Sequence, residues 1–266
     1  MARPISFLSD YGRDDDFVGV CHGVMAQLAP EARVIDLTHG IPRYDVRTGA
    51  LILRRALPFL PAGIHLAVVD PEVGGDRLPV ALRTASDERI LIGPDNGLLS
   101  LAARRFDGAV EAVDLSRSPV RLEPASATFH GRDIFAPAAA ALATGAALAD
   151  VGDPIDPDGL VELHMPLARL EAAGIVAHAM NIDRFGNVML DVEHEELAAS
   201  GLRLGHPLLA NDVPCIYATT FADVAPGELI VYQDAYRTLA LAVNRGSAAE
   251  RLGLELDHEV RLRPSP

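Results

Sequence analysis

Acidic side chains stand where two apolar runs of the sequence end, and a histidine stands before a third. Asp10 comes after the run Ile5–Leu8, and Asp70 follows the run Ile64–Val69. Ligands gather at strand ends in α/β sheets, where a carboxylate can hold ribose hydroxyls or orient an imidazole. His130 precedes the sequence Gly-Arg-Asp and is a candidate general base. From position alone, Asp10 and Asp70 are equally compatible with a turn or helix-cap role, and a lone histidine such as His130 is more often structural than catalytic.

A second group of residues combines aromatic rings with amide side chains. Phe185 and Asn187 stand close together, and Phe221 begins the sequence Phe-Ala-Asp. Rings of this kind stack on purines and amides read a purine edge, but core packing with a turn asparagine is the alternative. Asn96 lies in Pro-Asp-Asn-Gly, which favours a β-turn over a loop that presents amide donors to a ligand.

Several common chemistries find no support in the sequence. It contains no GxGxxG, GxSxG or HExxH motif, the signatures of dinucleotide-binding, serine-hydrolase and zincin sites. It also contains no lysine, which excludes Schiff-base chemistry and makes every fixed positive charge an arginine. The histidines are scattered, so no metal site is expected. The acidic run Asp14–Asp16 is interpreted as a solvated helix start.

Composition favours an acidic cytoplasmic protein. The 266 residues are 49% hydrophobic and carry a formal net charge of -14. Such a chain is not expected to bind nucleic acid, because a phosphate backbone requires a basic face. No apolar run reaches the roughly 20 residues of a membrane span, and Met1–Pro4 leads into a strand-like segment rather than a signal peptide. Cys21 and Cys215 are expected to be free thiols in packed positions.

The alternation of strand-like and helix-like stretches predicts an α/β domain with a central, mainly parallel sheet and flanking helices. The turn-rich segment 153–159 interrupts this pattern. Short strand-like runs separated by Gly, Pro or Asn follow, and they predict a small all-β, barrel-like domain. We place the first domain at residues 1–158 and the second at 172–266. Helices are predicted at Phe17–Leu28, Arg47–Leu57, Gly97–Arg105 and Ile134–Leu142.

Taken in order, eight segments of the sequence resemble those of one family, the SAM hydroxide adenosyltransferases. These enzymes act on S-adenosylmethionine (SAM) and are related to the SAM-dependent fluorinase and chlorinase. The resemblance covers nearly the whole chain, and eight segments in the same order are strongly specific. The matching segments are SDYGRDDDFV, THGIPRYDV, VVDPEVGG, GPDNGLL, TFHGRDIFAP, NIDRFGNV, TFADV and AVNRG.

The resemblance implies an N-terminal α/β domain, a C-terminal β-barrel, and no metal or cofactor. It implies a homotrimer that binds SAM between the N-terminal domain of one subunit and the C-terminal domain of the next. By this resemblance Asp10 holds the ribose hydroxyls, Tyr44 packs near the ribose, and the loop that carries Asn96 contributes to the substrate site.

In the second domain, the resemblance assigns the adenine to Phe185, Asn187 and Phe221, and the methionine ammonium group to Asp183. Residues 233–237 depart from the turn that contacts the methionine carboxylate in the family. The candidates for binding the carboxylate are Arg237, which lies within that segment, and Arg245, which follows it in the chain.

Three positions concern the nucleophile. The hydroxide enzymes of the family carry Asp, Arg and His at the positions that match Asp70, Arg77 and His130, whereas the halogenases carry Tyr at the first and the last. Gly131 stands where the fluorinase has a fluoride-contacting Ser, and the fluorinase insertion before the Pro-Asp-Asn-Gly loop is missing. The resemblance therefore favours water over halide.

The expected reaction is hydrolysis of SAM to adenosine and L-methionine by attack of water at the ribose C5′. Arg77 stabilises the developing hydroxide, and Asp70 orients His130 or accepts a hydrogen bond from it. Either Asp70 or His130 is the base. The alternatives are a SAM-dependent halogenase, a SAM- or adenosine-binding module without turnover, and a nucleoside hydrolase-like enzyme that releases adenine.

Overall fold

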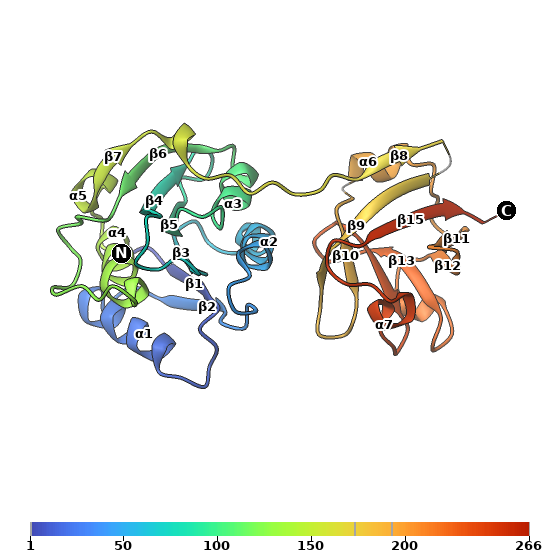
Figure 1. Cartoon of the computed structure of the whole chain (residues 1–266), viewed down its shortest axis with the longest axis horizontal. Helices are drawn as coiled ribbons and strands as arrows, with labels where there is room; N and C mark the ends of the chain where they lie inside the picture. Colours follow the sequence, from blue (N-terminus) through green and yellow to red (C-terminus); the bar gives the residue numbers. More distant parts are fainter. Residues whose placement is uncertain (1, 173, 193, 266) are drawn as a thin grey trace. The chain divides into compact units, whose positions relative to one another are not determined.

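The computed structural model describes residues 2–172, 174–192 and 194–265. The chain divides into two compact units, Met1–Leu163 and His164–Pro266, each with its own hydrophobic core (Figure 1). The division falls within the stretch between the two predicted domains. No helix among the described residues is long and apolar enough to cross a membrane.

The first unit is built on a seven-stranded sheet with the order β2-β1-β3-β5-β4-β6-β7. Strands β2, β1, β3 and β5 are parallel, and β4 pairs antiparallel with both β5 and β6, so β6 again runs in the direction of the parallel strands. The predicted mainly parallel sheet is therefore confirmed. The strands are β1 (Ile5–Ser9), β2 (Val34–Thr38), β3 (Ile64–Val68), β4 (Pro79–Thr84), β5 (Ile90–Pro94), β6 (Ala109–Asp114) and β7 (Asp153–Ile155).

Helices cover both faces of this sheet (Figure 1). α1 packs against α4, which contacts β1 and β3, while α3 packs against α2, which contacts β1. Because successive strand residues point to opposite faces, Phe7 of β1 enters the core that also holds Met25 of α1 and Phe135. The helices are α1 (Phe17–Leu28), α2 (Val46–Ala56), α3 (Ser100–Arg105), α4 (Ala136–Ala143) and α5 (Leu148–Val151).

The predicted helix Phe17–Leu28 is confirmed with its bounds, but two other helices start later than predicted. α3 begins at Ser100, because Gly97 has a φ of +91° and cannot belong to a right-handed helix. The stretch before α4 is a π-helical turn, Gly131–Phe135. Both cysteines are free and buried, as predicted, and burial raises the pKa of each thiol to about 12.

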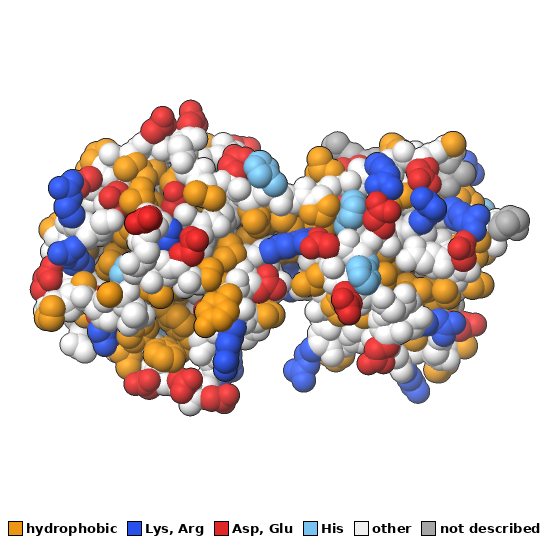
Figure 2. Space-filling view, viewed as in Figure 1, with side chains coloured by type: hydrophobic (Ala, Val, Ile, Leu, Met, Phe, Trp, Pro, Cys, Tyr) orange, Lys and Arg blue, Asp and Glu red, His pale blue; other side chains and the backbone are white. Residues whose placement is uncertain are grey.

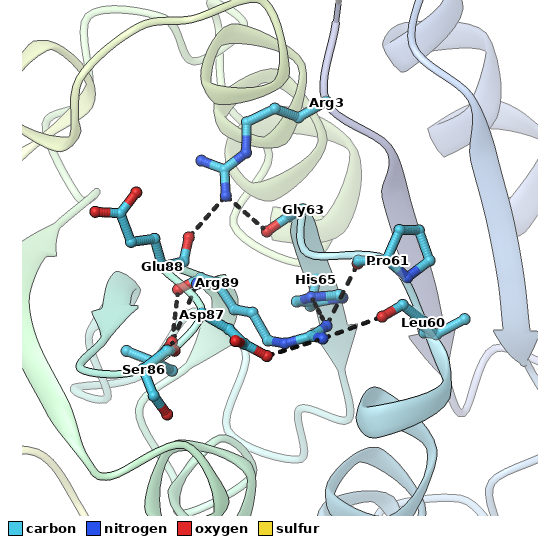
Figure 3. Close-up of polar contacts among 10 residues, drawn as sticks. Arg3, Leu60, Pro61, Gly63, His65, Ser86, Asp87, Glu88 and Arg89 are labelled. Carbon is cyan, nitrogen blue, oxygen red and sulfur yellow. Dashed lines mark hydrogen bonds and ion pairs between the residues drawn. The ribbon is translucent and has the colours of Figure 1, made fainter.

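A polar network is buried at the amino end of β3 (Figure 3). Nη1 of Arg89 donates to Nε2 of His65 at 3.2 Å, and its two terminal nitrogens also donate to the carbonyls of Pro61 and Leu60. Because arginine only donates, Nε2 of His65 must accept, and its Nδ1–H donates to Ser6 Oγ at 2.8 Å. Burial, and then the Arg89 guanidinium, lower the pKa of His65 from 6.5 to about 3.

This neutral histidine makes the stability of the first unit depend on pH. The unfolded chain binds a proton at His65 below pH 6.5, whereas the folded chain does not until about pH 3. Stability from this group is therefore complete above pH 6.5 and is lost as the pH falls, by up to about 1.4 kcal/mol for each pH unit. We expect His65→Gln to flatten this part of a urea-unfolding series between pH 6.5 and 4. An unchanged pH slope in the variant would contradict the assignment.

The second unit is a closed β-barrel with one additional strand. The eight-stranded sheet has the order β10-β14-β13-β12-β11-β15-β9-β8, and a further pairing of β10 with β9 closes the ring, which leaves β8 outside it. The predicted barrel-like domain is confirmed. All neighbours in the ring are antiparallel except β12 and β13, which are parallel. The strands are β8 (Arg169–Glu171), β9 (Gly174–Ile182), β10 (Val188–Leu190), β11 (Pro207–Ala210), β12 (Val213–Tyr217), β13 (Leu229–Gln233), β14 (Leu239–Val243) and β15 (Glu259–Pro264).

Two short helices, α6 (His194–Ala199) and α7 (Ala248–Leu252), accompany the barrel. Alternate apolar residues of its strands, such as Ile175, Ala177 and Ala179 of β9, fill the interior. On the face drawn in Figure 2, acidic and basic side chains are interspersed over both units. The described side chains of that face form no continuous basic surface of the kind that a phosphate backbone requires.

Candidate active site

A pocket of about 380 Å³ opens at the carboxyl ends of β1 and β3 in the first unit. These strands are parallel neighbours, so the residues that follow them lie at the same edge of the sheet. Two carboxylates, those of Asp10 and Asp70, reach the pocket for this reason. Its lining includes Asp10, Tyr11, Tyr44, Asp70, Thr128 and His130. Of these, Tyr11 and Thr128 were not predicted, although each stands in the same short motif as a predicted residue.

Arg77 links Asp70 to His130. Its Nε donates to Oδ1 of Asp70 at 2.9 Å, its Nη2 donates to Oδ2, and Nη2 also donates to Nδ1 of His130 at 2.8 Å. The side chains of Asp70 and Arg77 are only 6% and 3% exposed, so this bidentate ion pair is buried. Nη1 of Arg77 is also buried and makes no hydrogen bond to the described residues. The guanidinium therefore has donors left for a further ligand.

The expected hydrogen bond between Asp70 and His130 is replaced by this bridge. Because Arg77 donates to Nδ1, a neutral His130 carries its proton on Nε2. Burial, and then the Arg77 guanidinium, lower the pKa of His130 below 6.5, while Asp70 and Asp133 act in the opposite direction. His130 is consequently neutral near pH 7, which is the form that can accept a proton.

Asp10 and Tyr44, which both line the pocket, are joined by a hydrogen bond from backbone to side chain. The N–H of Tyr44 donates to Oδ2 of Asp10 at 2.9 Å. Tyr44 has a φ of +67° and a largely exposed ring. Burial raises the pKa of Asp10, and the hydrogen bond from Tyr44 opposes this shift. The loop that carries Tyr44 is thus fastened to the carboxylate at the end of β1.

Gly131 allows the Tyr11 ring to approach the π-helical turn. A Cβ at position 131 would lie 2.1 Å from Oη of Tyr11 and 3.1 Å from the ring carbon that bears it. Tyr11 in turn packs edge-on against Phe129 and Phe7. Burial raises the pKa of Tyr11 well above its usual value, so its phenol remains protonated. The absence of a side chain at Gly131 therefore sets the position of a buried hydroxyl group in the pocket wall.

We expect Gly131→Ala to lower the free energy of unfolding by about 1–3 kcal/mol, because the added methyl group overlaps Oη of Tyr11. Tyr11→Phe removes that oxygen, so the same glycine replacement in a Tyr11→Phe background is expected to cost much less. The measurement is urea unfolding of the two single variants and the double variant. Equal costs of Gly131→Ala in both backgrounds would show that the overlap does not govern this position.

Asn96 stabilises the chain next to Asp70. Its Nδ2 donates to the carbonyl of Val69 at 2.9 Å, and its Oδ1 accepts from the N–H of Leu98 at 3.2 Å. Both ends of the amide are therefore engaged by backbone groups, as the β-turn interpretation predicts. This contact holds the residue that directly precedes Asp70.

In the second unit, Asp183 closes the turn between β9 and β10. Its Oδ1 accepts from the backbone N–H groups of Phe185 at 2.8 Å and Asn187 at 3.0 Å, and its Oδ2 accepts from Asn187 Nδ2 at 2.8 Å. Gly186 has a φ of +78°, and a Cβ there would lie 2.1 Å from Oγ of Ser247. The structure thus brings three predicted residues into one turn, with the Phe185 ring mostly exposed.

Phe221 and Arg245 lie on other loops of the second unit. Phe221 begins a 3-10 turn, and its half-exposed ring lies 5.1 Å from the ring of Tyr232. Burial, and then Asp234 and Asp183, raise the pKa of Tyr232 to about 12. Tyr232 was not predicted, because it stands in an ordinary apolar strand with no motif around it. Arg245 is exposed, in the turn between β14 and α7, with a φ of +59°.

Fold and pocket together define a class of protein, in which an α/β unit with a polar pocket at its parallel strand ends precedes a closed β-barrel. The chain belongs to the SAM hydroxide adenosyltransferase family. The N-terminal domain model of that family matches residues 5–152, and the C-terminal domain model matches residues 177–261.

Some proteins similar to this chain are named as hydrolases of S-adenosylmethionine, and others are named as fluorinases. A protein of Salinispora tropica named (R)-S-adenosyl-L-methionine hydrolase is 49% identical, over 97% of each chain. A protein of an Actinoplanes species named fluorinase is 29% identical, over 92% of each chain. The solved structure of a conserved protein from Thermotoga maritima superposes with a TM-score of 0.91 at 31% identity, and covers 97% of this chain and 99% of that one.

Proposed function

We propose that this protein is an (R)-S-adenosyl-L-methionine hydrolase, which uses water to cleave SAM into adenosine and L-methionine. The observation that carries the proposal is the Asp70–Arg77–His130 cluster at the strand-end pocket, whose groups are suited to bind and deprotonate a water molecule. The relative named as a hydrolase is also considerably more similar to the chain than the one named as a fluorinase.

The reaction is a displacement at the ribose C5′ of SAM. A bond forms between the water oxygen and C5′ as the bond from C5′ to sulfur breaks, and the electron pair of the broken bond passes to the sulfonium. Methionine leaves as a neutral thioether, so no acid is needed to protonate it. The water loses one proton, and a nucleophile held in line behind the breaking bond gains the advantage of proximity.

Each group of the cluster has a role in preparing this water. The free donors at Nη1 of Arg77 bind the oxygen and stabilise hydroxide as it forms. Asp70 keeps the guanidinium in place with two hydrogen bonds. His130 takes the proton at Nδ1 when Nη2 of Arg77 turns from the ring to the stronger negative charge of the hydroxide.

The substrate groups are divided between the two units. The first unit holds the ribose, with Asp10 at the hydroxyls, Tyr44 over the sugar and the Asn96 loop beside them. The second unit holds the adenine and the amino-acid part; beyond its three turn contacts, Asp183 keeps one lone-pair site on Oδ2 for the methionine ammonium. The residues proposed to bind SAM are Asp10, Tyr44, Asn96, Asp183, Phe185, Asn187, Phe221 and Arg245.

Product analysis with SAM in isotopically labelled water tests the proposed function. We expect equal amounts of adenosine and methionine, with the label in the adenosine 5′-hydroxyl. Three other results would overturn the proposal: a halogenated deoxyadenosine when chloride or fluoride is present, free adenine, or SAM returned intact. They would indicate a halogenase, a nucleoside hydrolase-like enzyme and a binding module, respectively.

We further propose a homotrimer in which the two halves of each site come from different subunits, as the family resemblance implies. His130→Gln inactivates the first unit and Phe221→Ala weakens the second, so co-expression of the two variants at equal levels tests this sharing. At low SAM, shared sites are expected to restore about a quarter of wild-type activity, because a heterologous ring pairs intact halves at random. Activity no higher than the average of the separate variants would contradict it. The cytoplasmic location and the absence of nucleic-acid and membrane partners stay predictions from composition.

A further inference from the structure

We propose that His22, Asp36 and His39 form a binding site for a divalent transition-metal ion, with zinc as its natural occupant. The site lies outside the SAM pocket. It joins α1, which carries His22, to β2, which carries Asp36 and is followed directly by His39. β2 is the edge strand of the sheet, so the site lies at the margin of the first unit.

The three ligand atoms already stand close to the spacing that zinc requires. Nε2 of His22 lies 2.8 Å from Oδ1 of Asp36, Nε2 of His39 lies 3.1 Å from the same oxygen, and all three atoms lie within 4.8 Å of one another. In a tetrahedral zinc site, bonds of about 2.0–2.1 Å place ligand atoms about 3.3 Å apart. The two distances to Asp36 therefore lie within about half an ångström of that spacing, and the two imidazole nitrogens lie no more than 4.8 Å apart.

His39 provides an independent indication of a ligand. Its side chain is only 1% exposed, yet its Nε2, which faces the other two groups, makes no hydrogen bond to the described residues. Oδ1 of Asp36 lies 3.1 Å from this nitrogen, but the two groups do not form a well-aligned hydrogen bond. A buried nitrogen without a partner is costly unless something binds it.

The surroundings of His39 prepare it to bind a metal. Nδ1 of His39 lies 2.8 Å from Oγ of Ser9, and the Phe7 ring packs edge-on against the imidazole with centroids 4.7 Å apart. A hydrogen bond from Nδ1–H to Ser9 leaves the lone pair on Nε2, and such outer contacts fix the orientation of metal-binding histidines.

The donor set determines the class of ion. Two imidazole nitrogens and one carboxylate oxygen suit zinc and its neighbours, whereas magnesium and calcium favour sites built from oxygen alone. His22 and Asp36 are each about one-third exposed, which gives the ion access from solvent. Asp36 supplies the negative charge that favours a cation at this site. The Arg13 guanidinium, which also acts on His39, opposes it.

Metal at this position would tie the first helix to the edge strand beside the SAM pocket. The backbone carbonyl of His39 accepts a hydrogen bond at 2.8 Å from the N–H of Gly12, and the loop of Gly12 carries Asp10 and Tyr11. The ion would therefore stabilise the loop that begins the pocket. This role does not depend on the chemistry proposed for the pocket.

Zinc titration of chelator-treated protein tests the site by calorimetry, with cobalt as a spectroscopic substitute. We expect one zinc ion bound per chain at micromolar or lower concentration, and visible d–d absorption when cobalt is bound. The decisive variant is His22→Gln, whose amide can still donate to Asp36 but is a poor zinc ligand. It is expected to weaken zinc binding at least about tenfold. Its thermal unfolding without metal should match that of wild type.

His178→Ala is the matched control, because His178 also pairs with a carboxylate, that of Asp191 at 2.7 Å, but no second imidazole is grouped with them among the described residues. This control is expected to bind zinc like wild type. The proposal is overturned if wild type binds no zinc at about 100-micromolar metal, a concentration that would half-fill even a site with a Kd of that order. It is equally overturned if His22→Gln binds like wild type, or if His178→Ala loses binding as strongly as His22→Gln.

Discussion

Replacement of Arg77 by methionine is expected to lower the turnover number by about a hundred- to a thousandfold, the usual effect of removing one preorganised donor from a developing oxyanion. The KM for SAM is expected to change little, because the proposed mechanism places Arg77 against the nucleophile and not against the substrate. Arg77→Lys tests whether charge alone is enough. Lysine keeps the charge but cannot hold Asp70 bidentately and His130 at once, so we expect it to recover only a small part of the activity.

The same replacement is expected to destabilise the protein, since it leaves the buried Asp70 carboxylate without its partner. Removal of one member of a buried ion pair typically costs about 3–5 kcal/mol. The double variant Arg77→Met/Asp70→Leu removes both charges, so it should regain most of the lost stability while its turnover stays low. Urea unfolding and adenosine formation, measured on the same preparations, separate the two effects. Recovery of turnover together with stability would show that Arg77 is only structural.

His130→Gln is expected to lower turnover by about a hundred- to ten-thousandfold, the range for loss of a general base. Glutamine retains a polar group that can accept from Arg77, so the buried ion pair should stay in place. KM is again expected to change little.

The pH profile identifies the base. In wild type, kcat/KM should fall as the pH drops through the lowered pKa of His130 in the free enzyme, which places this acid limb below pH 6.5. The direction follows because the base must be neutral, and a lowered pKa keeps it neutral to lower pH. His130→Gln should lack this limb. If the limb persists in the variant, the proton goes to Asp70 and the role of His130 is to position Arg77.

Part of the site follows from the sequence because strand ends are easily recognised. Asp10 and Asp70 each come after a short apolar run, and parallel neighbouring strands must bring such residues to one edge. Arg77 is different, because it lies in the loop between β3 and β4, where no periodicity fixes the position of a side chain. Only the resemblance singled it out, and its place between Asp70 and His130 required the structure.

In the barrel, too, some strands could be predicted from the sequence and others could not. The apolar runs Gly174–Ile182 and Leu239–Val243 are among the short strand-like runs predicted for the second domain, and the structure confirms them as β9 and β14. β15 alternates buried Val260 and Leu262 with exposed charged residues, a period-two signal that was not predicted because its polar half dominates the composition. β11 begins at Pro207, a residue that argues against a strand interior but is tolerated at the first position. The grouping of His22 with His39 was equally hidden, because the elements that carry them are separate in the sequence.

The parallel pair β12 and β13 has a consequence for the location of Phe221. A closed ring whose neighbours alternate in direction needs an even number of members, and seven strands close this ring once β8 is left out. At least one pair must therefore share a direction, and here it is β12 with β13. Parallel neighbours cannot be joined by a hairpin, so the chain has to travel from one end of the barrel to the other after Tyr217. Because β12 and β13 are also consecutive in the chain, this parallel pair requires a long connection, and Phe221 with its exposed ring lies on it.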